Sequence, residues 1–208
     1  MFITFEGIEG SGKSTQLVLL KEYLLKKGLS VLTLREPGGT LLGESVRSML
    51  LTVGEEEISP EAELFLYEAC RAQLVINVIM PAINKGTVVL CDRFTDSTIA
   101  YQGYGRGLDI GAIRSMNETA SGGLTPDITI VLDIEAETGL KRAWSRLKEE
   151  EGIKEDRFER EELEFHEKVR TGFLEIAASE QRVRIVKASR KIHSIHEEIC
   201  DIIDGMSL

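Results

Sequence analysis

Short apolar runs rich in β-branched residues recur along the chain, and longer stretches with helical spacing separate them. Continuous apolar runs of this kind predict β-strands that are buried on both faces. The predicted strands are residues 1–6, 29–34, 87–91, 127–133 and 183–188. Strands that alternate with helices predict an α/β fold, in which a five-stranded parallel sheet is flanked by helices.

Start and stop signals define the predicted helices. One is expected over residues 14–27, with Gly28 as its C-terminal cap, and another over 41–51. Ser59 and Pro60 form a helix start, with a hydroxyl cap followed by proline at the first position. That helix can continue to about Asn84. The last helix carries one apolar stripe, formed by Ile192, Ile195, Ile199, Ile202 and Ile203.

The composition restricts the class of protein. The chain has 208 residues, of which 42% are hydrophobic, and this suits one domain over residues 1–208. Its formal net charge is -10, whereas nonspecific nucleic-acid binders are normally basic. Cys70, Cys91 and Cys200 lie far apart, so they predict neither a metal site nor a disulfide framework. The apolar runs are shorter than the roughly 20 residues that cross a bilayer. We therefore predict a cytoplasmic protein without nucleic-acid or membrane partners.

The stretch TFEGIEGSGKST lies between the first predicted strand and the first predicted helix. Its spacing, from Gly7 to the run Gly12-Lys13-Ser14, is that of a phosphate-binding loop. Backbone N–H groups of such a loop and the positive end of the helix surround phosphate oxygens. Lys13 is expected to reach the β- and γ-phosphates and Ser14 to bind Mg²⁺, so the stretch predicts an ATP or GTP site.

Other segments narrow the class of nucleotide user. The guanine-reading motif Asn-Lys-x-Asp of GTPases is missing, because the Asn84-Lys85 pair is followed by Gly86 and Thr87. The chain is also short for a motor or a transporter ATPase. A small kinase that phosphorylates a bound metabolite is therefore the class that the sequence favours.

Candidate acceptor residues follow the third strand and lie on the long helix. Asp92 and Arg93 come directly after the strand at 87–91, so a parallel sheet would bring them beside the phosphate loop. There Asp92 suits a water of Mg²⁺, and Arg93 suits a clamp on the acceptor phosphate. Tyr67 and Arg71 are one helical turn apart and could stack on a base and bond its edge. A core tyrosine and a surface arginine are the alternative.

The same long helix is apolar on several faces. Its remaining apolar residues include Phe65, Ala69, Ala72, Ile76 and Ile79. A helix that is apolar on several sides needs burial on several sides, and this predicts a contact between subunits in a homodimer.

The segments FEGIEGSGKST, REPGGT, AELFLYEACRAQL, DRFTDSTIAYQGYGRG and DRFE together resemble the bacterial thymidylate kinase family. The resemblance covers nearly the whole chain, and the segment from Asp92 to Gly103 is its most specific part. It implies a nucleoside-monophosphate-kinase fold with a lid. It also implies phosphoryl transfer from ATP to dTMP with Mg²⁺, which gives dTDP for dTTP biosynthesis.

The resemblance further implies roles for individual residues. The residues expected to hold ATP are Gly7, Ile8, Glu9, Gly10, Ser11, Gly12, Lys13, Ser14 and Thr15. Ser14 and Asp92 would serve the metal. The residues expected to bind dTMP are Glu9, Arg35, Arg47, Tyr67, Arg71, Arg93, Thr98, Tyr101 and Gln102. Among them, Glu9 would lie near the 3′-hydroxyl and Tyr101 at the sugar edge. Tyr67 would stack on the base, Arg71 would read O4, and Thr98 and Gln102 would lie near the ring.

Family members differ in the source of one catalytic charge. Some carry an arginine in the phosphate loop where this chain has Gly10, so here an arginine of the lid, over residues 142–157, is implied to reach the transferred phosphoryl group. The candidates are Arg142, Arg146 and Arg157. We favour Arg146, with Lys13 and Arg93 as the other catalytic residues, although a solvated charged helix is the alternative for this segment.

Three other functions compete with this interpretation. They are a nucleotide kinase for a different base, a deoxynucleoside kinase that uses Glu9 as a base, and a nucleotide-binding regulator without turnover. His193 and His196 lack a third metal ligand nearby and are assigned to the surface. His166 receives no role.

Overall fold

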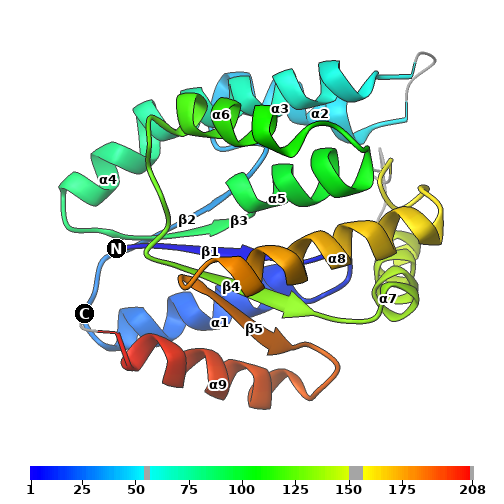
Figure 1. Cartoon of the computed structure of the whole chain (residues 1–208). Coiled ribbons are helices and arrows are strands. Elements are labelled where there is room, and N and C mark those ends of the chain that lie inside the picture. The colour runs from blue at the N-terminus through cyan, green and yellow to red at the C-terminus, as the bar shows by residue number, and fades with distance from the viewer. Residues whose placement is uncertain (54–56, 150–156, 207–208) are drawn as a thin grey trace.

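The computed structural model describes residues 1–53, 57–149 and 157–206. Across these residues, five strands form one parallel sheet in the order β2-β3-β1-β4-β5 (Figure 1). The strands are β1 (Phe2–Glu6), β2 (Val31–Arg35), β3 (Val88–Asp92), β4 (Ile128–Asp133) and β5 (Val183–Lys187). Each lies close to its predicted bounds, and the predicted α/β architecture is confirmed.

Helices cover both faces of the sheet. Helix α1 (Lys13–Lys26) and α9 (Ile192–Asp204) lie on one face (Figure 1). The opposite face is covered by α3 (Pro60–Leu74), α4 (Met80–Asn84), α5 (Thr95–Thr98), α6 (Ile110–Ser121) and α8 (Leu163–Ser179). Helix α2 (Leu41–Leu51) packs on α3, and α7 (Ala136–Glu149) stands beyond the carboxyl ends of the strands.

Strand β1 lies at the centre of the sheet because it pairs with both β3 and β4. Its side chains alternate between the faces, as the strand geometry requires. Ile3 and Phe5 belong to a core cluster that includes Leu20 of α1, whereas Phe2 belongs to a second cluster with Leu74. The strand is therefore buried throughout, and it delivers the phosphate loop from the interior of the sheet.

The long helix begins and ends near its predicted bounds. The Ser59 hydroxyl accepts a hydrogen bond from the N–H of Ala62, at 3.3 Å, so the predicted cap is present. A π-helical turn, η1 (Val75–Ile79), joins α3 to α4. In the described part of the chain, Pro60–Asn84 is the one helix long and apolar enough, by length and composition, to cross a membrane. This corrects the expectation that no apolar stretch is long enough, although buried helices of soluble proteins pass the same test.

Candidate active site

The phosphate loop turns sharply between β1 and α1. Gly7, Gly10 and Gly12 have φ angles of 132°, 68° and 95°, which side-chain-bearing residues rarely adopt. No side chain caps α1 among the described residues. The N–H groups of its first turn are therefore available to an anion, as the loop spacing predicts.

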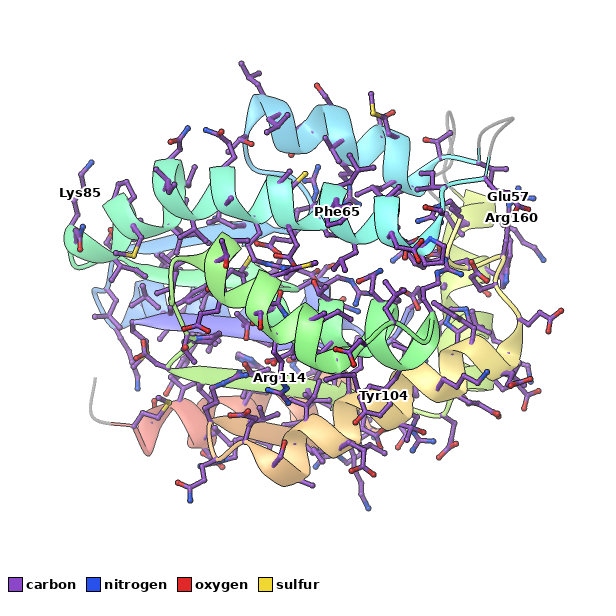
Figure 2. The ribbon with its side chains drawn as sticks, turned by 45° about the horizontal axis from the view of Figure 1, so that its top comes forward. Glu57, Phe65, Lys85, Tyr104, Arg114 and Arg160 are labelled. Carbon is purple, nitrogen blue, oxygen red and sulfur yellow. The ribbon has the colours of Figure 1, made fainter. Side chains whose placement is uncertain are left out.

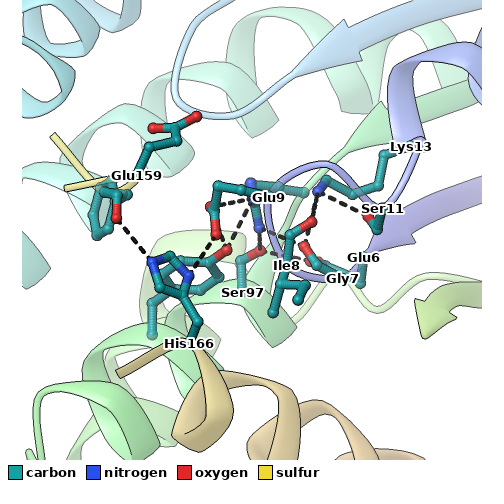
Figure 3. Close-up of polar contacts among 12 residues, drawn as sticks. Glu6, Gly7, Ile8, Glu9, Ser11, Lys13, Ser97, Glu159 and His166 are labelled. Atoms are coloured by element: carbon teal, nitrogen blue, oxygen red, sulfur yellow. Dashed lines mark hydrogen bonds and ion pairs between the residues drawn. The ribbon is translucent and has the colours of Figure 1, made fainter. Parts of the chain in front are cut away.

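Lys13, the first residue of α1, lies inside this loop (Figure 3). Its Nζ donates hydrogen bonds to the carbonyl oxygens of Gly7 (2.8 Å) and Ile8 (2.9 Å). Burial, together with the nearby charge of Arg93, lowers the pKa of Lys13 to about 8 against the opposing effect of Asp92. A phosphate group beside the ammonium would favour its charged form.

Arg93 follows β3 and is held by both its backbone and its side chain. It is the non-glycine residue with a positive φ, 72°, in the described ranges, and its N–H donates to the carbonyl of Phe5. Nη1 donates to Gly7 O and Ser97 Oγ, both at 3.1 Å, and Nη2 donates to Glu9 Oε1 at 2.9 Å. The guanidinium therefore lies beside the phosphate loop.

Asp92 connects the end of β3 to the start of α1. The Ser14 hydroxyl donates to Asp92 Oδ2 at 2.8 Å. A hydroxyl and a carboxylate oxygen at this spacing fit Mg²⁺, which takes one or two protein ligands in addition to phosphate oxygens.

These side chains line one cavity of about 420 Å³. The predicted site residues that line it are Glu9, Gly10, Lys13, Ser14, Arg35, Arg47, Tyr67, Arg71, Asp92, Arg93, Thr98, Tyr101, Gln102 and Arg146. The other predicted loop residues, Gly7, Ile8, Ser11, Gly12 and Thr15, belong to the loop and the start of α1 without lining the cavity.

Arg71 is buried at the far end of the cavity, so the alternative of a surface arginine is wrong. Its Nε and Nη2 donate to Glu36 Oε2 at 3.0 and 2.7 Å, and its Nη1 donates to Glu68 Oε1 (3.0 Å) and Asn117 Oδ1 (2.7 Å). A guanidinium has five N–H donors. Among the described residues, these bonds leave one N–H of Nη2 for a ligand.

The wall beside Arg71 comes from α5 and the π-helical segment η2 (Ile99–Gly105). Thr98 Oγ1 is buried without a hydrogen-bond partner in the described part of the chain. Gln102 Nε2 donates to Glu63 Oε1 at 2.6 Å. The Tyr101 hydroxyl donates to Glu9 Oε1 at 2.5 Å and accepts from Arg93 Nη2 at 3.0 Å.

The arginines at the mouth of the cavity differ in what they contact. Arg35 pairs with Glu44 at 2.8 Å, and Arg47 Nη1 donates to the carbonyl of Pro37 at 3.1 Å. Arg146 lines the cavity and lies 3.5 Å from Glu159.

The other two candidate lid arginines are directed elsewhere. Arg142 Nη1 donates to Ala188 O, and Arg157 Nη2 donates to Glu63 Oε2 at 2.6 Å; neither lines the cavity. Residues 150–156 of the predicted lid lie outside the described residues, as does Asp156 of the DRFE segment.

Gly10 and Gly139 bring the loop and α7 into backbone contact. A Cβ at Gly10 would lie 2.0 Å from Gly139 O, and a Cβ at Gly139 would lie 2.5 Å from Glu9 O. Because both obstacles are backbone atoms, neither can move aside as a flexible side chain would. A larger residue at position 10, arginine included, is excluded sterically in this arrangement.

The Gly139→Ala variant is therefore expected to unfold more easily than the parent and to lose activity. An alanine normally stabilises a helix interior by about 1 kcal/mol relative to glycine, so the opposite sign identifies the backbone contact. Gly111→Ala, on an exposed turn of α6 where a Cβ would meet only Asp109 Oδ1 at 3.2 Å, is the matched control. Thermal unfolding of the three proteins makes the comparison, and equal behaviour of the two variants would contradict the contact.

Two site residues were not identified from the sequence, Glu6 and His166. Glu6 ends β1 behind Arg93: its Oε1 accepts from the N–H of Phe94 (2.8 Å), and its Oε2 accepts from the Ser97 hydroxyl (2.5 Å), which itself accepts from Arg93. An acidic residue at the end of an apolar strand was the available signal. For His166, a lone histidine in a polar stretch gave none.

Burial, together with the charge of Asp96, raises the pKa of Glu6 to about 8. A carboxyl whose folded pKa lies above its unfolded value stabilises the fold fully below the unfolded pKa, near 4.5, and this contribution is lost as the pH rises to about 8. The slope can reach about 1.4 kcal/mol per pH unit. Glu6→Gln keeps the shape and removes the titration. Its free energy of unfolding should therefore decline less than that of the parent from about pH 5 to about pH 8 in urea titrations, and parallel pH curves would disprove the assignment.

Comparisons with known proteins agree with this geometry. A family model described as thymidylate kinase matches residues 5–199. The thymidylate kinase of Nitratidesulfovibrio vulgaris strain Miyazaki F is 53% identical over 201 residues, which cover 96% of this chain and 94% of that protein. The thymidylate kinase of Geotalea daltonii is 52% identical over 206 residues, covering 98% and 96%. A crystal structure of thymidylate kinase from Ehrlichia chaffeensis superposes with a TM-score of 0.79 at 35% identity, covering 98% of each chain. With sequence and fold both matched over nearly its whole length, the chain belongs to the thymidylate kinase family, and its reaction is the ATP-dependent phosphorylation of dTMP to dTDP.

Proposed function

We propose that the phosphate loop around Lys13 binds ATP and that Arg93 holds the phosphate of dTMP opposite it. The observation that carries this proposal is that Lys13 and Arg93 line the same cavity, with the Ser14–Asp92 pair between loop and strand end. Both cations donate a hydrogen bond to the carbonyl oxygen of Gly7, so donor and acceptor phosphates would be held next to each other.

The chemistry then requires alignment and charge neutralisation. The attacking phosphate oxygen of dTMP is already ionised, so no strong general base is needed. Lys13 and Arg93 would neutralise the two phosphate groups, and Arg146, which lines the cavity, would reach the transferred phosphoryl group. Ser14 and Asp92 would hold Mg²⁺, which supplies further positive charge to the phosphate oxygens when bound.

Base selection would take place at the Arg71 end of the cavity. The remaining N–H of Arg71 can donate to a carbonyl oxygen such as O4 of thymine, whereas the amino group of cytosine would present a donor to a donor. Tyr67 would stack on the ring, with Thr98 and Gln102 at its edge.

The test is a panel of substrates, dTMP, dUMP, dCMP, dGMP and thymidine, each assayed with ATP and Mg²⁺. We expect dTMP to give the highest kcat/KM and dCMP to be discriminated strongly. Faster turnover of thymidine than of dTMP would contradict the role of Arg93, because a nucleoside has no phosphate for it to hold.

We also propose a homodimer formed through α3. Phe65 (Figure 2), Ala69, Ala72 and Ile76 lie at helical spacing on one face of α3 and η1, and Phe65 and Ile76 are 58% and 71% exposed. Ile79, named with them from the sequence, belongs instead to the core. A second copy of this face would cover the stripe. Because such a dimer would cover this apolar face, we also propose a cytoplasmic location without a membrane partner.

The Ile76→Asp variant should therefore be monomeric in light scattering, because a carboxylate on the stripe would be desolvated by the partner. Val18→Asp, at an exposed position of α1 on the opposite face of the sheet, should leave the dimer intact. A parent protein that is monomeric at all concentrations would disprove the proposal.

A further inference from the structure

His166 is a buried polar residue that the proposed function leaves without a task. It lies in α8 and is 0% exposed. Its Nδ1 is 3.1 Å from Glu9 Oε2, and its Nε2 is 3.0 Å from the carbonyl oxygen of Phe158 (Figure 3). The ring thus joins the phosphate loop to the chain segment that carries Glu159, another residue that lines the cavity.

The neighbours of the ring define where its hydrogens lie. A carbonyl oxygen only accepts, so the hydrogen of that contact belongs to Nε2. On the other side, Nδ1 faces Glu9 Oε2, and within the described ranges neither of these two buried atoms has another polar partner. An unpaired carboxylate oxygen in this buried position would be costly, and a ring N–H beside it removes that cost. His166 therefore holds the oxygen of Glu9 that Arg93 does not contact.

The other oxygen of Glu9 is already used on the cavity side. Oε1 accepts from Arg93 and from the Tyr101 hydroxyl. Burial would raise the pKa of Glu9, but the hydrogen bond with His166 and the charges of Arg93 and Lys13 hold it well below its usual value. The carboxylate is thus anchored on one side by α8 and on the other by the two residues that face the acceptor.

The position of Glu9 decides which N–H donors Arg93 presents to a ligand. In the described structure the four Nη hydrogens of Arg93 already donate, to Gly7 O, Ser97 Oγ, Glu9 Oε1 and the Tyr101 hydroxyl, which leaves Nε–H for a ligand. If Glu9 were free to turn, its second oxygen could pair with Nε, because carboxylates commonly bind a guanidinium through two oxygens. Such a bidentate pair would occupy the donor that the phosphate of dTMP needs.

We propose that His166 is a positioning residue for the acceptor nucleotide: it holds Glu9 from behind, so that Nε–H of Arg93 stays open to the phosphate of dTMP. This inference rests on the proposed roles of Glu9 and Arg93, and it adds a residue that touches neither substrate.

The test compares three substitutions of His166 in the full-length protein. His166→Leu removes both contacts and should raise the KM for dTMP roughly 10- to 100-fold, which corresponds to the loss of one charge-assisted hydrogen bond, while the KM for ATP stays unchanged. His166→Asn retains a donor near the position of Nδ1 and should recover most of that loss. His166→Gln retains a donor near Nε2 only and should not.

Ile176→Ala is the matched control, because Ile176 is equally buried in α8 but lies near its far end. It should lower the melting temperature and leave the KM for dTMP unchanged. Recovery by glutamine instead of asparagine would overturn the proposal, since it would show that only the Phe158 contact matters. An unchanged KM for dTMP in His166→Leu, or equal effects on the KM for both substrates, would overturn it as well. Inactivity of the parent protein toward dTMP would instead count against the proposed function itself.

Discussion

Replacing Lys13 by alanine is expected to reduce turnover by about 10³-fold or more, the scale seen when a preorganised positive group is removed from a phosphoryl-transfer site. Nζ of Lys13 lies where the loop carbonyls of Gly7 and Ile8 converge, so its charge is fixed before ATP arrives. Neutral residues at position 13 cannot replace that charge. The measurement is steady-state ADP formation with dTMP, ATP and Mg²⁺.

Stability serves as the control for this variant. Removing a buried ammonium relieves its desolvation, so the fold should survive the loss of its hydrogen bonds. Lys26→Ala makes the same chemical change at an exposed position of the same helix and should leave turnover unchanged. A folded Lys13→Ala protein with turnover like that of the parent would refute the role given to the loop.

Substitution of Arg93 is expected to have the second large effect, a loss in kcat/KM for dTMP on the order of 10³-fold. Arg93→Lys should recover little of it, because an ammonium lacks the planar fork that contacts Ser97 and Glu9 through separate nitrogens and still offers Nε–H to the phosphate. The KM for ATP should change much less. Arg114→Ala, an exposed arginine of α6, is the control and should behave like the parent.

The backbone of Arg93 supplies an independent test. A φ of 72° costs a side-chain-bearing residue roughly 1–2 kcal/mol relative to glycine. Arg93→Gly and Arg93→Ala lose the same guanidinium, so both should be equally inactive. The glycine variant should nevertheless be more stable than the alanine variant by about 1 kcal/mol. Equal stability of the two variants would show that the backbone at this position is not strained.

Much of this architecture follows from local sequence signals. The apolar runs predicted the strands because parallel strands are buried on both faces, and β1 is buried along its whole length. The predicted cap at Ser59 is present because a hydroxyl, a proline and an acid stand in the order that a helix start requires. Lys13 and Arg93 could be brought together in advance, because residues after neighbouring parallel strands meet at one edge of the sheet.

Helices α6 and α8 were not predicted, although local signals were present. The Asp109 carboxylate accepts from the N–H of Ala112, and Gly122 adopts a left-handed conformation at the end of α6. In α8, Phe165, Val169 and Phe173 repeat at helical spacing. The dense charge before α8 obscured that pattern.

Other features have no local signal at all. The π-helical turns η1 and η2 change the register of their helices, and hydrophobic spacing does not reveal them. The polar partners of Arg71 come from three separate segments: Glu36 follows β2, Glu68 belongs to α3 and Asn117 belongs to α6. Only the folded chain brings them together. The contact between His166 and Glu9 depends in the same way on where α8 crosses the loop.

The contact between Gly10 and Gly139 also bears on how such a chain can change over generations. An arginine introduced at position 10 would strike the first turns of α7, so a single substitution there meets a steric barrier before it can supply any charge. A lineage that moved this charge into the loop would first have to shift α7 away from it. A loop arginine and a lid arginine are therefore separated by a shift of the α7 backbone, which a single substitution does not supply.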